Sequence, residues 1–146
     1  MVDISEKAES TRTAVAEGFI CMSADVLAQV EQQAMAKGDV LSVARIAGIQ
    51  GAKRCADLIP LCHPLALNKV AIEFDIDREN NRIRIESLCR VTGKTGVEME
   101  ALTAVSTAAL TIFDMCKALG LNMSIEGIRV LDKKGGKSGH WSHQAT

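Results

Sequence analysis

The sequence predicts an α+β domain in which an antiparallel sheet is covered on one face by helices. Segments with the two-residue alternation of strands are separated by segments whose apolar residues recur at helical spacing. Two of the strand-like segments are neighbours joined by a short polar turn, which is the pattern of an antiparallel hairpin. Strands and helices in this order favour one layer of each, as in ferredoxin-like folds.

The N-terminal third is expected to hold one strand and two helices. Residues 13–22 alternate between two faces and predict the strand, and Ser23 is typical of a helix N-cap. Apolar residues at helical spacing predict a helix over residues 24–36, which a following glycine ends. A second helix is expected over residues 39–53.

A stiff loop and the hairpin follow. Pro60 and Pro64 push the residues before them towards extended backbone, so the segment between them is expected to be a rigid loop. Strands are expected over residues 69–77 and 82–92, and the polar residues 78–81 between them suit the hairpin turn.

The main helix is expected in the C-terminal half. Thr95 and Glu98 have the spacing of a capping box, and the apolar run over residues 97–119 predicts about six helical turns. The four charged residues inside that run indicate a buried helix instead of a membrane span. A last strand over residues 124–131 leads to the basic, glycine-rich residues 133–139, which could form a lid over an anion, and then to a polar tail.

Composition narrows the class of protein. A chain of 146 residues with 47% hydrophobic residues suits one domain over residues 1–146. A net charge of −1 gives no field for nucleic acid or an anionic membrane, and three Phe, one Trp and no Tyr offer no platform for stacking bases. Five cysteines without a Cys-x-x-Cys pair, behind an N-terminus that does not match a signal peptide, indicate the reducing cytoplasm.

The main helix carries the acidic candidates for chemistry. Asp114 and Lys117 share one helical face, where a carboxylate can orient an amine for proton transfer. The simpler interpretation is an ordinary ion pair on the surface. The apolar residues around the pair instead favour a site that is covered. Glu98 is interpreted as the cap. Glu100 precedes Asp114 by about 21 Å of helix, so one ligand reaching both requires a neighbouring chain.

Other candidates are basic or sulfur-containing. Lys37, Lys53, Arg54 and His63 are possible phosphate partners, although scattered lysines usually mark a solvated surface. Cys62 and His63 are adjacent and lack the spaced partners of a zinc site, so no metal is expected.

Long ordered segments of the chain resemble the MoaC family, that of cyclic pyranopterin monophosphate synthase, over nearly the whole length. The segments are MVDISEKAE (1–9), KGDV (37–40), ARIAGI (44–49), DLIPLCHP (57–64), TGKTGVEMEALTA (92–104), DMCK (114–117) and GGKSG (135–139).

The resemblance implies a cofactor-free lyase of molybdenum cofactor biosynthesis. Its substrate would be a cyclised dihydroguanosine triphosphate supplied by an upstream radical enzyme, and its products cyclic pyranopterin monophosphate and pyrophosphate. A ferredoxin-like fold, and a homohexamer built as a trimer of dimers with sites shared between subunits, are implied too. By motif, the catalytic residues would be Asp114, Lys117 and Lys37, and the substrate contacts Leu61, Cys62, His63, Met99 and Glu100; Lys53 is added as a phosphate partner.

Three positions depart from the family pattern. Phe113 stands where a tyrosine is common, Cys55 and Ala56 replace a threonine and an aromatic residue, and Lys134 replaces a serine. A lost tyrosine hydroxyl would remove one hydrogen bond, worth about 1 kcal/mol, so activity is expected to survive.

Two other functions stay open at this point. A regulatory domain that binds a small molecule at the same subunit interface would show no turnover and no need for Lys117. A metal-dependent hydrolase using His63 and nearby carboxylates would lose activity to a chelator and regain it with metal.

Overall fold

The computed structural model of the chain describes residues 1–33, 37–137 and 139–144. Its elements alternate between strand and helix in the order βαββαβ, with one further short strand at the end. They are β1 (Ser10–Cys21), α1 (Ala24–Glu31), α2 (Val40–Lys53), α3 (Cys55–Leu58), β2 (Lys69–Asp77), β3 (Arg82–Gly93), α4 (Glu98–Cys116), a 3-10 turn (Lys117–Leu119), β4 (Ser124–Lys134) and β5 (His140–Ser142).

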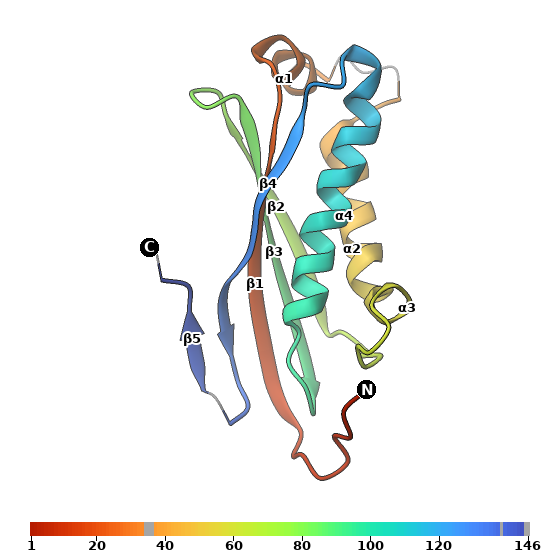
Figure 1. The fold of residues 1–146 in the computed structure, drawn as a ribbon, viewed down its shortest axis with the longest axis vertical. Helices are drawn as coiled ribbons and strands as arrows, with labels where there is room; N and C mark the ends of the chain where they lie inside the picture. Colours follow the sequence, from red (N-terminus) through yellow and green to blue (C-terminus); the bar gives the residue numbers. More distant parts are fainter. Residues whose placement is uncertain (34–36, 138, 145–146) are drawn as a thin grey trace.

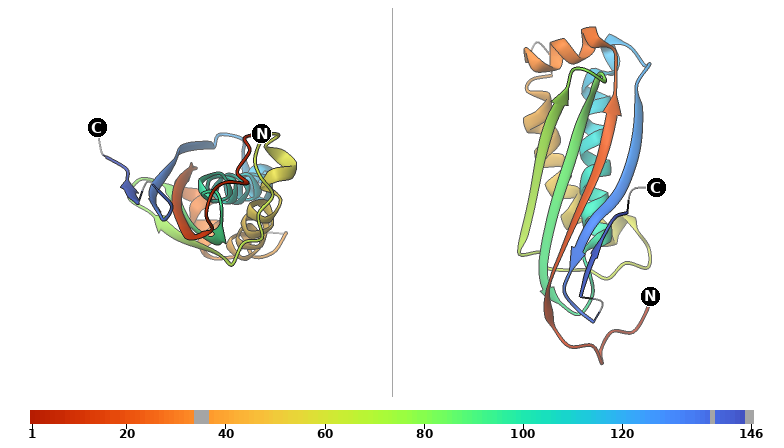
Figure 2. Two further views of the ribbon diagram at one scale, coloured as in Figure 1. Left: turned by 90° about the horizontal axis from the view of Figure 1, so that it is seen from below. Right: turned by 90° about the vertical axis from the view of Figure 1, so that its left-hand side faces the viewer.

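One five-stranded sheet has the order β2-β3-β1-β4-β5, and every pair of neighbouring strands is antiparallel. The helices α2 and α4 lie side by side on one face, with α1 across one end (Figure 1). Figure 2 shows the opposite, open face of the twisted sheet with the helices behind it. The predicted α+β, ferredoxin-like class is therefore confirmed.

The central strand β1 buries small residues against the helices. Ala14, Ala16 and Ile20 are completely buried, and Gly18 lies between them on the same face. A side-chain carbon built on Gly18 would lie 2.5 Å from Cγ1 of Val105 in α4. The small side chains thus allow the helix axis to approach the sheet closely.

The helix α4 forms the centre of the core. With its 3-10 extension it is long and apolar enough to cross a membrane. The structure packs it against the sheet and beside α2, and Ala101, Ala104, Val105, Ala108 and Ile112 are completely buried there. Its apolar composition is therefore explained by packing, as the sequence predicted.

Several boundaries agree with the sequence. Ser23 accepts a hydrogen bond from the backbone N–H of Val26, and Asp39 from that of Ser42, so both act as N-caps. The strand β2 matches its predicted range, while β1 begins three residues before the predicted residue 13. The predicted helix over residues 24–36 ends at Glu31, and residues 34–36 lie outside the described part of the chain.

Other expectations were wrong. No side chain caps α4 at Val97, and Glu98, the supposed partner in a capping box with Thr95, pairs instead with Lys133 at 3.4 Å. The polar tail contains a strand that was not predicted, because His140–Ser142 pairs with β4 as β5. The described residues of the segment 133–139 form the end of β4 and the turn into β5; Ser138 lies outside the description.

Candidate functional site

The loop after α3 and the first turn of α4 face each other across a pocket of about 300 Å³. The rigid loop expected between the two prolines has no regular secondary structure and presents three consecutive side chains to the pocket. The helix presents two more. These are the five residues predicted as substrate contacts: Leu61, Cys62, His63, Met99 and Glu100.

Glu100 is the buried acid of this pocket. Its side chain is 3% exposed, and Cys62 Sγ donates to its Oε2 at 3.6 Å. Burial raises the pKa of the Glu100 carboxyl, which its own backbone N–H and Cys62 only partly offset. Burial, followed by the nearby Glu100 and Cys55, raises the pKa of the Cys62 thiol to about 12. The pocket therefore favours the protonated, uncharged forms of Glu100 and Cys62.

The raised pKa of Glu100 makes stability depend on pH. The folded chain keeps this proton after the unfolded chain has lost it, so the free energy of unfolding falls as pH rises above the unfolded value of 4.5. We expect Glu100→Gln to flatten this fall. The measurement is urea unfolding between about pH 5 and pH 8 in chelator-containing buffer. Glu73→Gln, at an exposed position of β2, is the control, and equal slopes in both variants would contradict the assignment.

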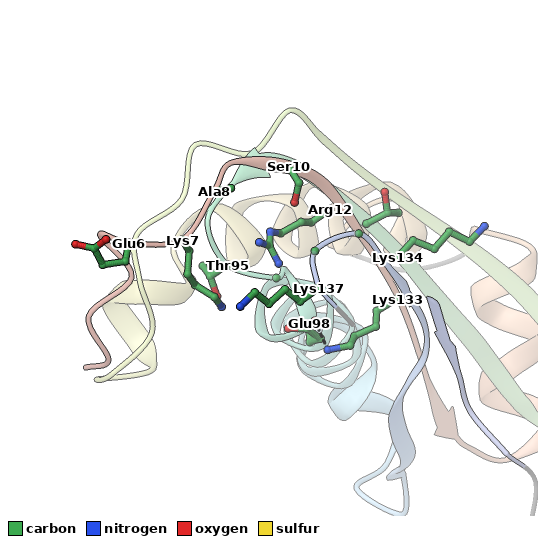
Figure 3. Close-up of a pocket in the computed structure, with 14 residues that line it drawn as sticks. Glu6, Lys7, Ala8, Ser10, Arg12, Thr95, Glu98, Lys133, Lys134 and Lys137 are labelled. Carbon is green, nitrogen blue, oxygen red and sulfur yellow. Dashed lines mark ion pairs between the residues drawn. The ribbon is translucent and has the colours of Figure 1, made fainter. Parts of the chain in front are cut away.

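A larger hollow of about 830 Å³ adjoins this pocket, and Thr95, Gly96 and Glu98 line both. Figure 3 shows four basic side chains converging on it from three segments, while those of Glu6 and Lys134 extend away. The four are Lys7, Arg12, Lys133 and Lys137.

The turn between β4 and β5 shapes one wall of this basic hollow. Gly135 and Gly136 have φ angles of 98° and 75°, which side chains rarely adopt. A side chain on Gly135 would collide with the Thr11 carbonyl, and one on Gly136 with the Arg12 guanidinium. Arg12 Nε donates to the Gly93 carbonyl at 3.0 Å. The glycines thus let the turn close against an arginine that is already oriented.

A third group of predicted residues meets at the far end of α4. Lys117 Nζ lies 2.8 Å from Asp114 Oδ1, and Lys37 Nζ lies 3.4 Å from Oδ2 of the same carboxylate. Lys117 and then Lys37 hold the pKa of Asp114 below its usual value. All three side chains are more than half exposed, so the described part of this chain does not cover the pair, and the covered site that the sequence favoured stays a prediction that needs a neighbouring chain.

The predicted residues therefore divide between the two ends of one helix. Glu100 and Asp114 are separated by about 21 Å of helix, so the two groups do not form one site within a single chain. Lys53 lies in a separate hollow of about 100 Å³, where it shares the lining with Cys55 and Glu100.

The basic hollow was largely missed by the sequence reasoning. Arg12 and Lys7 precede the predicted strand start, and Glu98 was interpreted as a cap. Lys7 and Lys137 belong to segments that resemble the family, and this could have marked both lysines as candidates. That the two lysines lie close together depends on the pairing of β1 with β4.

The chain was compared with known proteins. A solved structure of a mutant of the ferredoxin protease FusC in complex with Arabidopsis ferredoxin is similar over 73% of this chain and 10% of that chain, with 14% identity and a TM-score of 0.34. This likeness is too low to support an argument. The model of the MoaC family matches residues 1–136. Because that match spans most of the 146 residues, the chain belongs to the MoaC family, which supports a role in molybdenum cofactor biosynthesis.

Proposed function

We propose that the chain is the cytoplasmic lyase that rearranges a cyclised dihydroguanosine 5′-triphosphate to cyclic pyranopterin monophosphate and releases pyrophosphate. The observation that carries the proposal is the adjacency of the basic hollow and the Glu100 pocket, which share Thr95, Gly96 and Glu98. A substrate with a polyphosphate at one end and a purine-derived heterocycle at the other matches such a two-part site.

The basic hollow supports the triphosphate end of this assignment. Four cationic side chains line this hollow: Lys7, Arg12, Lys133 and Lys137. One of them, Lys133, pairs with Glu98, and its Nζ lies 3.4 Å from the Glu98 carboxylate. A guanidinium can bind two phosphate oxygens at once, and lysine ammonium groups add point charges. Cations around the departing pyrophosphate would stabilise the charge that develops on it.

The Glu100 pocket supports the heterocycle end. A buried carboxyl with a raised pKa can both donate and accept hydrogen bonds, as the amide-like edge of a guanine-derived ring requires. His63 Nε2 donates to the Val2 carbonyl at 2.6 Å, which leaves Nδ1 as an acceptor in the neutral ring. Leu61 and Met99 are exposed at the mouth and would pack on the ring.

The lysine-carboxylate group supplies the proton-transfer chemistry. The reaction must open and rebuild rings and let an alkoxide displace pyrophosphate at the α-phosphate, which needs acids, bases and cations. Lys117 and Lys37 share Asp114 and could exchange protons with substrate while the carboxylate keeps both oriented. No cofactor or metal enters the proposed reaction.

Two ends of one helix can serve one substrate if subunits combine. Symmetric assembly would bring Asp114 and Lys117 of a neighbouring chain to the pocket that holds Glu100. Exposed Leu58, Leu61 and Met99 near that pocket supply an apolar surface for such a contact. We propose a homohexamer built as a trimer of dimers, with the upstream radical enzyme acting as supplier of the substrate.

The test is turnover by the native chain in the presence of a chelator. We expect pterin product and pyrophosphate to form in equal amounts from the cyclised triphosphate, and uncyclised GTP, the control, to give neither. Binding of the substrate without turnover would favour the regulatory-domain alternative. Activity that the chelator removes and added metal restores would favour a metal-dependent hydrolase.

A further inference from the structure

Three possible metal ligands converge behind the Glu100 pocket. Cys55, at the start of α3, is 1% exposed, and its Sγ lies 3.9 Å from Sγ of Cys62, seven residues later. Cys62 Sγ lies 3.6 Å from Glu100 Oε2. All three ligand atoms lie within 4.8 Å of one another, although Cys55 belongs to α3, Cys62 to the loop after it and Glu100 to α4.

These separations match the edges of a tetrahedral zinc site. Zn–S bonds of about 2.3 Å and Zn–O bonds of about 2.1 Å place two sulfur ligands about 3.8 Å apart, and a sulfur and an oxygen about 3.6 Å apart. The observed distances are 3.9 and 3.6 Å. The third edge, between Cys55 Sγ and the Glu100 carboxylate, is at most 4.8 Å, so a small side-chain movement closes the set around a cation.

We propose that Cys55, Cys62 and Glu100 form an inhibitory binding site for a thiophilic divalent cation, and that Zn²⁺ is the cation their two sulfurs and one oxygen fit. Cys62 and Glu100 also line the pocket assigned to the heterocycle. The fourth coordination position would face that pocket and take water or another small ligand. On binding, the two thiols release their protons to solvent, and so does the Glu100 carboxyl wherever it is protonated.

The surroundings support a coordination site. Thr103 Oγ1 lies 3.3 Å from Cys55 Sγ and can donate a hydrogen bond to the thiolate, as outer groups of zinc sites do. Cys55 is buried in the core side of the cluster, and the loop that carries Cys62 is held between two prolines. Cys62 was predicted to lack a spaced metal partner, but Cys55, seven residues earlier, lies against it because α3 turns the chain between them.

Occupation of this site would block the proposed reaction. The cation would hold Cys62 and Glu100, so the heterocycle could not use the Glu100 carboxyl. This consequence rests on the proposed function, whereas cation binding itself does not. Zinc is therefore expected to inhibit, and the proposed reaction remains metal-independent.

Cobalt binding tests the site directly. Reduced, full-length native protein titrated with Co²⁺ should take up one ion per chain and show thiolate-to-cobalt charge transfer with the visible bands of tetrahedral Co²⁺, which Zn²⁺ then displaces. Cys55→Thr should lower this affinity by about 100-fold or more. If the threonine variant does not fold, Cys55→Ala replaces it and should show the same loss of cobalt affinity. Cys21→Ser, at a thiol at the end of β1, should bind like the native chain.

The outcomes are separable. A cobalt spectrum without thiolate charge transfer, or one unchanged in Cys55→Thr, would overturn the site and place binding elsewhere, such as at His140 and Asp132. Zinc should inhibit native turnover and spare Cys55→Thr, whose metal-free activity is retained. Equal inhibition of both would overturn the inhibitory role. Absence of turnover by the native chain would count against the proposed function alone, since the cobalt spectrum does not depend on it.

Discussion

Lys117→Ala is expected to lower the rate of product formation by about 10²–10⁴-fold, the usual contribution of a positioned acid or base. Lys117 Nζ lies 2.8 Å from Asp114, and both side chains are more than half exposed. Exposed ion pairs contribute little to stability, so the variant should unfold at the same urea concentration as the native chain. Stopped assays for pterin product and pyrophosphate measure the loss, and Lys69→Ala, an exposed lysine at the start of β2, is the control.

Mixed oligomers extend this prediction to the shared site. If one subunit supplies Lys117 and its neighbour supplies Glu100, then Lys117→Ala and Glu100→Ala, each inactive alone, should recover activity after mixing and reassembly. Random mixing in equal amounts leaves about one quarter of the sites with both native residues. A Lys117→Ala chain that retains native turnover would remove Lys117 from the mechanism. Mixed oligomers that stay inactive would contradict a site shared between subunits.

The sequence predicted those parts of the fold whose cause is local. The strand β2 matched its predicted range because alternation along the chain determines which residues face the core. Ser23 and Asp39 were found because an N-cap needs only its own helix. The strand β5 was missed, since three exposed residues carry no hydrophobic pattern and pair with β4 through the backbone.

The same limit applies to the site. The five residues around the Glu100 pocket come from two continuous motifs, so the sequence could identify them. The basic hollow collects side chains from β1, from the residues before it and from the end of β4, and their meeting depends on strand pairing. Cys55 was recognised only as a departure from the family pattern, because its distance to Glu100 depends on how α3 packs beside α4.

The contact between α2 and α4 depends on a glycine, and Gly48→Val is expected to destabilise the fold by about 2–3 kcal/mol through overpacking. A side-chain carbon at Gly48 would collide with Cδ1 of Ile72 and lie 2.9 Å from the backbone oxygen of Ala104. Ile72 could change rotamer, but the carbonyl belongs to α4 and cannot move without shifting the helix that carries both Glu100 and Asp114.

Urea unfolding at a fixed protein concentration measures the effect of Gly48→Val, because assembly makes the midpoint depend on concentration. Gln50→Val introduces the same residue at an exposed position of α2 and controls for the low helix propensity of valine, which is worth less than about 1 kcal/mol. Equal midpoints for the two variants would show that the helices can separate to admit a side chain. A lower midpoint for Gly48→Val alone would show that the close approach of α2 to α4, the helix that carries both Glu100 and Asp114, stabilises the fold.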